Sequence, residues 1–125
     1  MGRAVVAVTL LPNLSRVYLY THNEGETLPE TVAEALVRGT GRWGDPSYLA
    51  RIIFSEMIKH DVMGLKDYGI YLTAPTDLDH PILVVNYKSQ ELWVAEVPGK
   101  GHMQSRRIPF QDFVSLPGPD WKAFE

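Results

Sequence analysis

The sequence predicts an α+β fold with an antiparallel sheet of about five strands and two adjacent helices packed on one face. Two helical segments, 27–39 and 45–60, follow one another directly, whereas the strand-like segments lie before and after them. The strand-like segments are joined by short connections, which suit antiparallel pairing. Parallel pairing between successive strands would need a helix between them, and the sequence contains no such helices.

Length and composition favour one compact domain. The chain has 125 residues, 45% of them hydrophobic, and a chain of this size buries roughly two-thirds of its unfolded surface. We expect a single domain at 1–116 and a mobile tail at 117–125, because Pro117-Gly118-Pro119 ends the ordered pattern. No apolar run approaches the roughly 20 residues that cross a bilayer, so we expect no membrane contact and a cytoplasmic location.

The first half of the chain predicts two strands and a helix. Ala4–Leu11 is an apolar run rich in valine, and Arg16–Tyr20 alternates apolar and polar residues; both patterns are typical of strands. We expect these strands to form an antiparallel hairpin. Thr27 and Glu30 have the spacing of a capping box that begins a helix, and Arg38-Gly39 suits its end.

The second helix is the most strongly specified element of the sequence. Asp45 is a favourable N-cap, and Pro46 loses nothing at the first helical position. The helix is expected to end near Lys59-His60, whose charges suit a helix C-terminus. Its apolar side repeats at helical spacing and needs a partner surface; it comprises Leu49, Ile52, Ile53 and Met57.

The second half of the chain predicts mainly sheet. Tyr68–Ala74 is aromatic and β-branched, and Ile82–Tyr87 and Glu91–Val97 flank the short connection Lys88–Gln90, as in a hairpin. Arg106–Leu116 is interpreted as a further edge strand followed by one helical turn. Together with the two early strands, these segments make up the predicted sheet.

Charge and cysteine content exclude several kinds of function. The chain has no cysteine, which excludes disulfides, thiolate zinc sites and cysteine nucleophiles. Its net charge of −3 gives no overall electrostatic drive toward nucleic acid. Lys100, Arg106 and Arg107 leave a local contact with a phosphate backbone open, although a solvated basic loop is the interpretation we favour.

His22 and Glu24 are the candidates for catalysis. They lie two residues apart in the connection between a strand and a helix, so His22 is a candidate general base or ligand oriented by the carboxylate. No nucleophile or second base is paired with them in the sequence. The alternative is a histidine that hydrogen-bonds backbone in a tight turn.

Arg42, Trp43 and Asp45 are the candidates for binding a ligand or partner. A guanidinium, an indole and a helix N-terminus in succession can hold a phosphate or a partner's carboxylate. A structural role is favoured, with Trp43 packed over the joint between the helices and Arg42 paired with a nearby acid.

Two further groups of residues are candidates for a metal site and for a contact with a partner. Asp77, Asp79 and His80 resemble the start of a metal site, but their spacing matches no complete ligand set, and such residues also form turns. No metal or cofactor is therefore predicted. Trp121 and Phe124 stand out in a polar tail; they either dock into a groove of a partner or fold back onto the domain.

Several segments resemble a family of small hypothetical proteins from bacteriophage and prophage genomes. They are Val-Tyr-Leu-Tyr-Thr-His at 17–22, Leu-Pro at 28–29, Arg-Trp-Gly-Asp-Pro-Ser-Tyr-Leu-Ala-Arg-Ile-Ile-Phe at 42–54, and the runs 68–70 and 80–85. Members often carry Tyr-x-His-Trp-Gly-Gly where this chain has Tyr-Thr-His-Asn-Glu-Gly at 20–25. The resemblance covers about Val17 to Tyr87 and implies a phage context and a small cytoplasmic domain, without implying an activity.

Three hypotheses of function follow from the sequence. The leading one is a non-catalytic accessory domain of phage type that binds a host or phage macromolecule, most simply a protein. The second is a small enzyme or ligand-binding domain centred on His22, Arg42 and Asp45, which requires these side chains to converge in one pocket. The third is an oligomeric virion or assembly component that uses an exposed edge strand as its contact.

Overall fold

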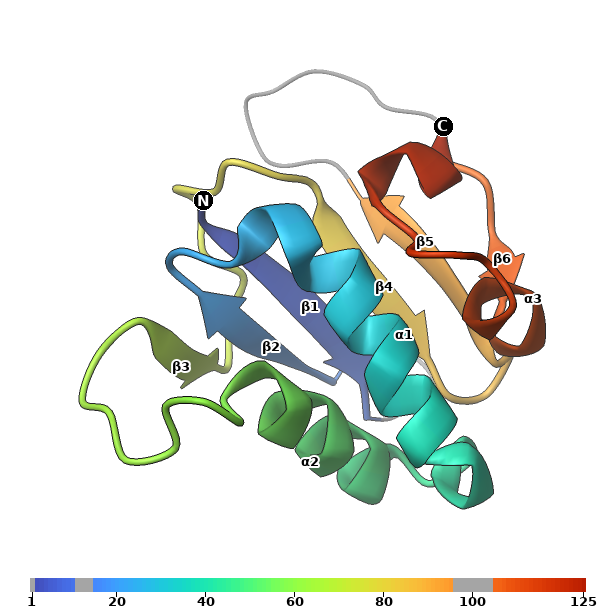
Figure 1. Ribbon diagram of the computed structural model, residues 1–125, viewed down its shortest axis with the longest axis horizontal. Helices are drawn as coiled ribbons and strands as arrows, with labels where there is room; N and C mark the ends of the chain where they lie inside the picture. Colours follow the sequence, from blue (N-terminus) through green and yellow to red (C-terminus); the bar gives the residue numbers. More distant parts are fainter. Residues whose placement is uncertain (1, 11–14, 96–104) are drawn as a thin grey trace.

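A mixed sheet of six strands, in the order β3-β2-β1-β4-β5-β6, forms the centre of the part of the protein that the structure describes. The computed structural model describes residues 2–10, 15–95 and 105–125 (Figure 1). The strands are β1 (Ala4–Thr9), β2 (Arg16–Thr21), β3 (Tyr68–Tyr71), β4 (Ile82–Asn86), β5 (Glu91–Ala95) and β6 (Ile108–Pro109). The α-helices are α1 (Leu28–Arg38), α2 (Pro46–Met57) and α3 (Phe110–Val114).

The α+β class is confirmed, but the prediction of a wholly antiparallel sheet of about five strands is wrong. The central strands β1 and β4 run parallel, with Ala7 opposite Val84, whereas the other neighbouring pairs are antiparallel. The short strand β6 adds a sixth strand. The chain passes from β1 to β4 through a long connection that includes β2, α1, α2 and β3. The two parallel strands are therefore not successive in the sequence, and their pairing does not require a helix between successive strands.

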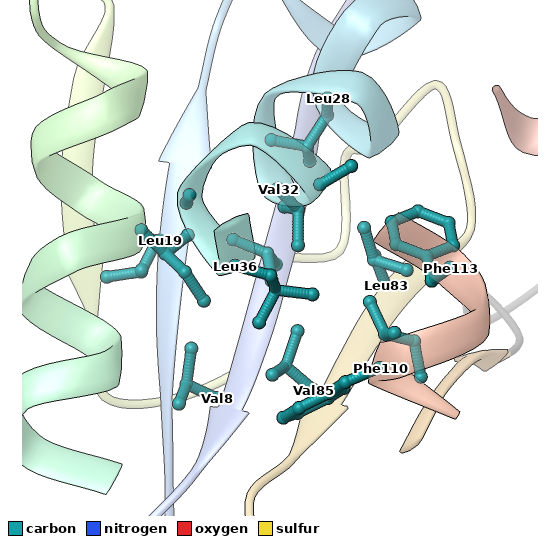
Figure 2. Close-up of a cluster of buried hydrophobic side chains, with 14 of the residues drawn as sticks. Val8, Leu19, Leu28, Val32, Leu36, Leu83, Val85, Phe110 and Phe113 are labelled. Carbon is teal, nitrogen blue, oxygen red and sulfur yellow. The ribbon is translucent and has the colours of Figure 1, made fainter. Parts of the chain in front are cut away.

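The two long helices cover one face of the sheet, as the sequence predicts. In Figure 1, α1 lies over the central strands, and α2 lies beside it toward β2. Figure 2 shows Val32 and Leu36 of α1 pointing into a cluster with Val8, Leu19 and Val85 of the sheet. These side chains are fully removed from water, which is the main favourable term in folding.

The opposite face of the central strands is buried without a helix among the described residues. Val5, Ala7 and Val84 on this face have no exposed surface. They pack in a second apolar cluster with half-buried aromatic rings of the neighbouring strands, among them Tyr18 and Trp93. The central strands β1 and β4 are therefore buried on both faces.

The helix starts differ in detail from the prediction. The capping box does not form: Thr27 makes no side-chain cap bond, and its hydroxyl instead donates to the carbonyl of Glu24 at 3.3 Å. Asp45 precedes α2, with Pro46 in its first turn, but its side chain does not cap the helix. The helix ends at Met57, earlier than predicted. No helix in the described ranges is long and apolar enough to cross a membrane.

The C-terminal segment 117–125, expected to be a mobile tail, packs against the domain. Residues Trp121–Phe124 form a 3₁₀ turn, and the ring of Phe124 is 1% exposed. Its centroid lies 5.7 Å from that of Phe113 in α3. The backbone N–H of Arg106 donates to the carbonyl of Phe124. This segment therefore completes the core at the β5–β6 side of the sheet.

We predict that Phe124→Ala destabilises the protein by about 3–5 kcal/mol, the usual cost of truncating a buried phenylalanine. Urea unfolding followed by circular dichroism measures the change. Lys122→Ala is the control, because Lys122 is exposed in the same turn and its truncation should change the free energy of unfolding by less than about 0.5 kcal/mol. Equal effects of the two substitutions would contradict the packing described for this segment.

Candidate functional site

Two depressions lie along α2 on the side of the molecule that carries β3. The first, here called the polar pocket, has a volume of about 150 Å³. It is lined by Thr21, Glu24, Leu28, Thr31, Glu56, Met57, Lys59, His60 and Tyr68. The second, here called the apolar groove, has a volume of about 320 Å³. It is lined by Val17, Leu19, Ala50, Arg51, Phe54, Ser55, Ile58 and Ile70.

The polar pocket forms where four elements meet. The end of β2 and the beginning of β3 are paired there, with Thr21 opposite Tyr68. Residues at the beginning of α1 and at the end of α2 supply the other walls. The apolar side chains of Leu28 and Met57 also line the pocket, and both belong to the core. The pocket therefore depends on the relative placement of both helices.

An ion-pair network forms one wall of the polar pocket. The carboxylate of Glu56 is 9% exposed and accepts hydrogen bonds from Lys59 Nζ at 2.7 Å and Arg38 Nε at 3.0 Å. The hydrogen bond from Lys59 lowers the pKa of Glu56 below its ordinary value; burial opposes this effect and Arg38 reinforces it. Lys59 Nζ also lies 3.6 Å from a carboxylate oxygen of Glu34 on α1. The charge of Glu56 is thus neutralised inside the protein.

Other polar side chains of the pocket have no such partners. The side chains of Glu24, Thr31, His60 and Tyr68 make no hydrogen bond or ion pair within the described part of the chain. Burial raises the pKa of the Tyr68 hydroxyl, and the nearby carboxylates of Glu24, Asp61 and Asp67 raise it further. Tyr68 therefore lies near three carboxylates, and the pocket has hydrogen-bonding groups available to a ligand.

The apolar groove runs between α2 and the edge of the sheet. Phe54 of α2 and Ile58, which follows the end of α2, form one side, and Ile70 of β3 forms part of the other. Among the described residues, β3 pairs with β2 alone and its outer edge has no partner strand. The connection before β3 and the residues after it add strongly exposed apolar side chains, including Leu65 (101%) and Leu72 (84%). Exposed apolar surface of this kind is typical of interaction sites.

The structure separates the residues of the predicted catalytic or ligand-binding centre. His22 precedes the beginning of α1, whereas Arg42 and Asp45 follow its end. An α-helix of 11 residues is roughly 16 Å long. The hydroxyl of Tyr20 and Nδ1 of His22 lie 3.0 Å apart, in hydrogen-bond contact. Of the predicted catalytic pair, only Glu24 lines the polar pocket.

Arg42, Trp43 and Asp45 contact neighbouring parts of the protein. The Trp43 indole donates to the carbonyl of Leu36 at 2.9 Å and packs edge-on against Phe110, with 5.4 Å between ring centroids. Arg42 Nη1 lies 3.6 Å from Oδ2 of Asp45, and its guanidinium lies over the ring of Tyr48. These contacts agree with the structural alternative described for this motif.

The residues weighed as a metal site are engaged by other side chains. Asp77 and Asp79 both form ion pairs with Arg3. The ring of His80 stacks on Trp121, with 5.0 Å between centroids and an angle of 5° between planes. Among the described residues, no group of three or more histidine, cysteine, aspartate or glutamate side chains is placed to hold a metal ion.

The aromatic residues near the C-terminus fold back onto the domain, which is one of the two alternatives for them. The indole of Trp121 donates to the carbonyl of Gly25 at 2.9 Å, and Phe124 is buried. In the basic group, Arg107 lies over the Trp93 ring and near Glu91, and Arg106 is exposed. Lys100 lies outside the described residues.

No protein-family model, curated protein or solved structure matches this chain. The resemblance to small phage proteins therefore remains an expectation about context.

We predict that Glu56→Gln lowers the free energy of unfolding at pH 7 by about 1.5–3 kcal/mol, the usual range for a hydrogen bond to a charged group. The folded-state pKa of Glu56 is lowered from its ordinary value of 4.5. Its stabilising effect is therefore present above that value and is lost as the pH falls through the lowered pKa. The wild type should lose more stability than the variant between pH 7 and about pH 3, measured by urea unfolding.

Glu34→Gln is the matched control for Glu56→Gln. Glu34 also faces Lys59, at 3.6 Å, but its side chain is 52% exposed, and exposed ion pairs contribute about 0–1 kcal/mol. Its substitution should leave the pH dependence close to that of the wild type. An effect of Glu34→Gln equal to that of Glu56→Gln would contradict a special role for the buried carboxylate.

Proposed function

We propose that this protein acts by binding another protein, and that β3 and the apolar groove form the binding surface. The observation that carries the proposal is the concentration of exposed apolar side chains in β3 and the segments that flank it, of which Ile70 lines the groove. Among the described residues, six of the nine large apolar side chains that are exposed lie within 62–72. They are Val62, Met63, Leu65, Ile70, Tyr71 and Leu72.

The occupant that fits best is an extended apolar segment of the partner. Such a segment can pair its backbone with the open edge of β3 and place alternate side chains into the groove, the mode known as β-augmentation. Burying one leucine-sized side chain contributes roughly 1.5–3 kcal/mol. Arg51 lines the groove and makes no ion pair within the described ranges, which favours an acidic residue in the bound segment.

Binding of another protein is also the leading hypothesis from the sequence, but the proposed surface is β3 and the apolar groove and not the C-terminal aromatics. The C-terminal aromatics, first considered as the contact, pack within the domain, whereas the connection before β3 supplies the exposed surface. The resemblance supports a host or phage protein in the host cytoplasm as the partner. The separation of His22 from Arg42 gives less support to an enzyme centred on them, and an assembly component would use the same edge strand for a copy of itself.

We predict that the intact protein selects apolar peptides from a random peptide library, and that Ile70→Lys weakens their binding at least tenfold. A lysine at this position places a charge beside the groove, and a tenfold change corresponds to about 1.4 kcal/mol. Val37→Lys is the matched control: Val37 of α1 and Ile70 are each 58% exposed, but Val37 does not line the groove. Fluorescence polarisation of labelled peptides gives the dissociation constants.

Hydrogen exchange and light scattering distinguish the binding of a partner segment at β3 from self-association through the same edge strand. Bound peptide should slow amide hydrogen exchange in 68–72 more than elsewhere, because the edge strand gains a partner. Equal binding by the Ile70→Lys and Val37→Lys variants, or failure to enrich apolar peptides, would refute the proposal. Light scattering that shows a dimer disrupted by Ile70→Lys and retained in Val37→Lys would favour the assembly component instead.

A further inference from the structure

We propose that the polar pocket binds an alkylammonium group, with the ammonium between Glu24 and the ring of Tyr68 and its aliphatic chain against Leu28 and Met57. All four residues line the pocket. This inference does not depend on the proposed function, because the polar pocket and the apolar groove share no lining residue.

The charges around the pocket favour a cation. Glu56 is neutralised by Arg38 and Lys59, and Lys59 is also close to Glu34. In contrast, Glu24, Asp61 and Asp67 make no ion pair within the described residues, and their negative charge acts on Tyr68. Of these three acids, only Glu24 lines the pocket. A carboxylate or phosphate would meet Glu24 there, and Lys59, which also lines the pocket, is already engaged by Glu56 and Glu34.

The chemistry of the lining matches both parts of an alkylammonium group. An ammonium has three donors and no acceptor, so it can donate to Glu24 and to the free hydroxyl oxygens of Thr31 and Tyr68. The ring of Tyr68 can also attract the cation electrostatically. The methylene groups of the ligand would cover Leu28 and Met57, whose side chains line the pocket but offer no polar atom for hydrogen bonding.

The size of the pocket limits the ligand to a short chain. Its volume of about 150 Å³ equals roughly five water molecules at their share of liquid volume, about 30 Å³ each. This suits an amine with a chain of about four carbons. The same group occurs in free aliphatic amines and in the lysine side chain of a peptide, so the experiment must distinguish these two sources.

The test is a titration of the full chain followed by NMR, with the methyl resonance of Met57 and the backbone amide of Tyr68 as reporters. The probes are butylamine, Nα-acetyl-lysine methylamide and, as the anionic control, butyrate. We expect both amines to shift these resonances with millimolar dissociation constants, and butyrate to leave them unchanged. Tighter binding of butylamine indicates a free amine, whereas tighter binding of the blocked lysine indicates a lysine side chain.

Variants make the test specific to the pocket. Glu24→Gln, at an exposed position where folding is preserved, should weaken amine binding at least tenfold. Asp112→Asn removes one acidic charge from the first turn of α3, away from the pocket, and should weaken binding less than twofold. The proposal is overturned if neither amine shifts the reporter resonances, if butyrate binds as well as butylamine, or if the two variants have equal effects.

Discussion

The parallel pairing of β1 with β4 is the constraint on which the rest of the structure depends. Val6 and Val8 of β1 lie on the helix-covered face, whereas Val5 and Ala7 lie on the other, and all four have no exposed surface. Each face of β1 therefore needs its own set of packing partners, which are the helices on one side and the second apolar cluster on the other. The connection that brings β4 beside β1 carries β2, both long helices and β3, so the parallel pair also fixes the elements that enclose the candidate site.

The width of the sheet explains why the site lies at β3. Six strands about 4.8 Å apart span roughly 24 Å, whereas two helices each about 10 Å across cover roughly 20 Å. At the β6 side, α3 and the C-terminal turn supply additional cover through Phe110, Phe113 and Phe124. At the β3 side, no described helix extends beyond α2. Ile70 therefore stays exposed at an open edge beside the groove.

The sequence predicted local elements better than their arrangement. The starts of both long helices and the hairpin between β4 and β5 could be predicted, because they depend on neighbouring residues such as Pro46. The uninterrupted apolar runs at β1 and β4 are typical of strands buried on both faces, but the short connections between the other strand-like segments favour antiparallel pairing. Parallel pairing depends on contacts distant in the sequence, such as that of Ala7 with Val84.

The candidate site was harder to predict for the same reason. In the sequence, Lys59 and His60 are favourable charges at a helix end. Their place in a pocket depends on the pairing of Thr21 with Tyr68, which are distant in the sequence. Trp43 and Phe124 are candidates for binding by residue type, yet residue type alone does not distinguish an aromatic that packs internally from one that binds a partner. A usable signal was present at 62–65, where three apolar residues lie in a connection without helical or strand periodicity.

One edge strand connects the two proposed binding surfaces. Tyr68 lines the polar pocket and Ile70 lines the apolar groove, and alternate residues of a strand lie on the same face. Because β3 has four residues and one neighbouring strand in the part of the chain that the structure describes, its pairing is among the less stable parts of such a fold. Both proposed surfaces therefore draw a side chain from the same face of a single short strand.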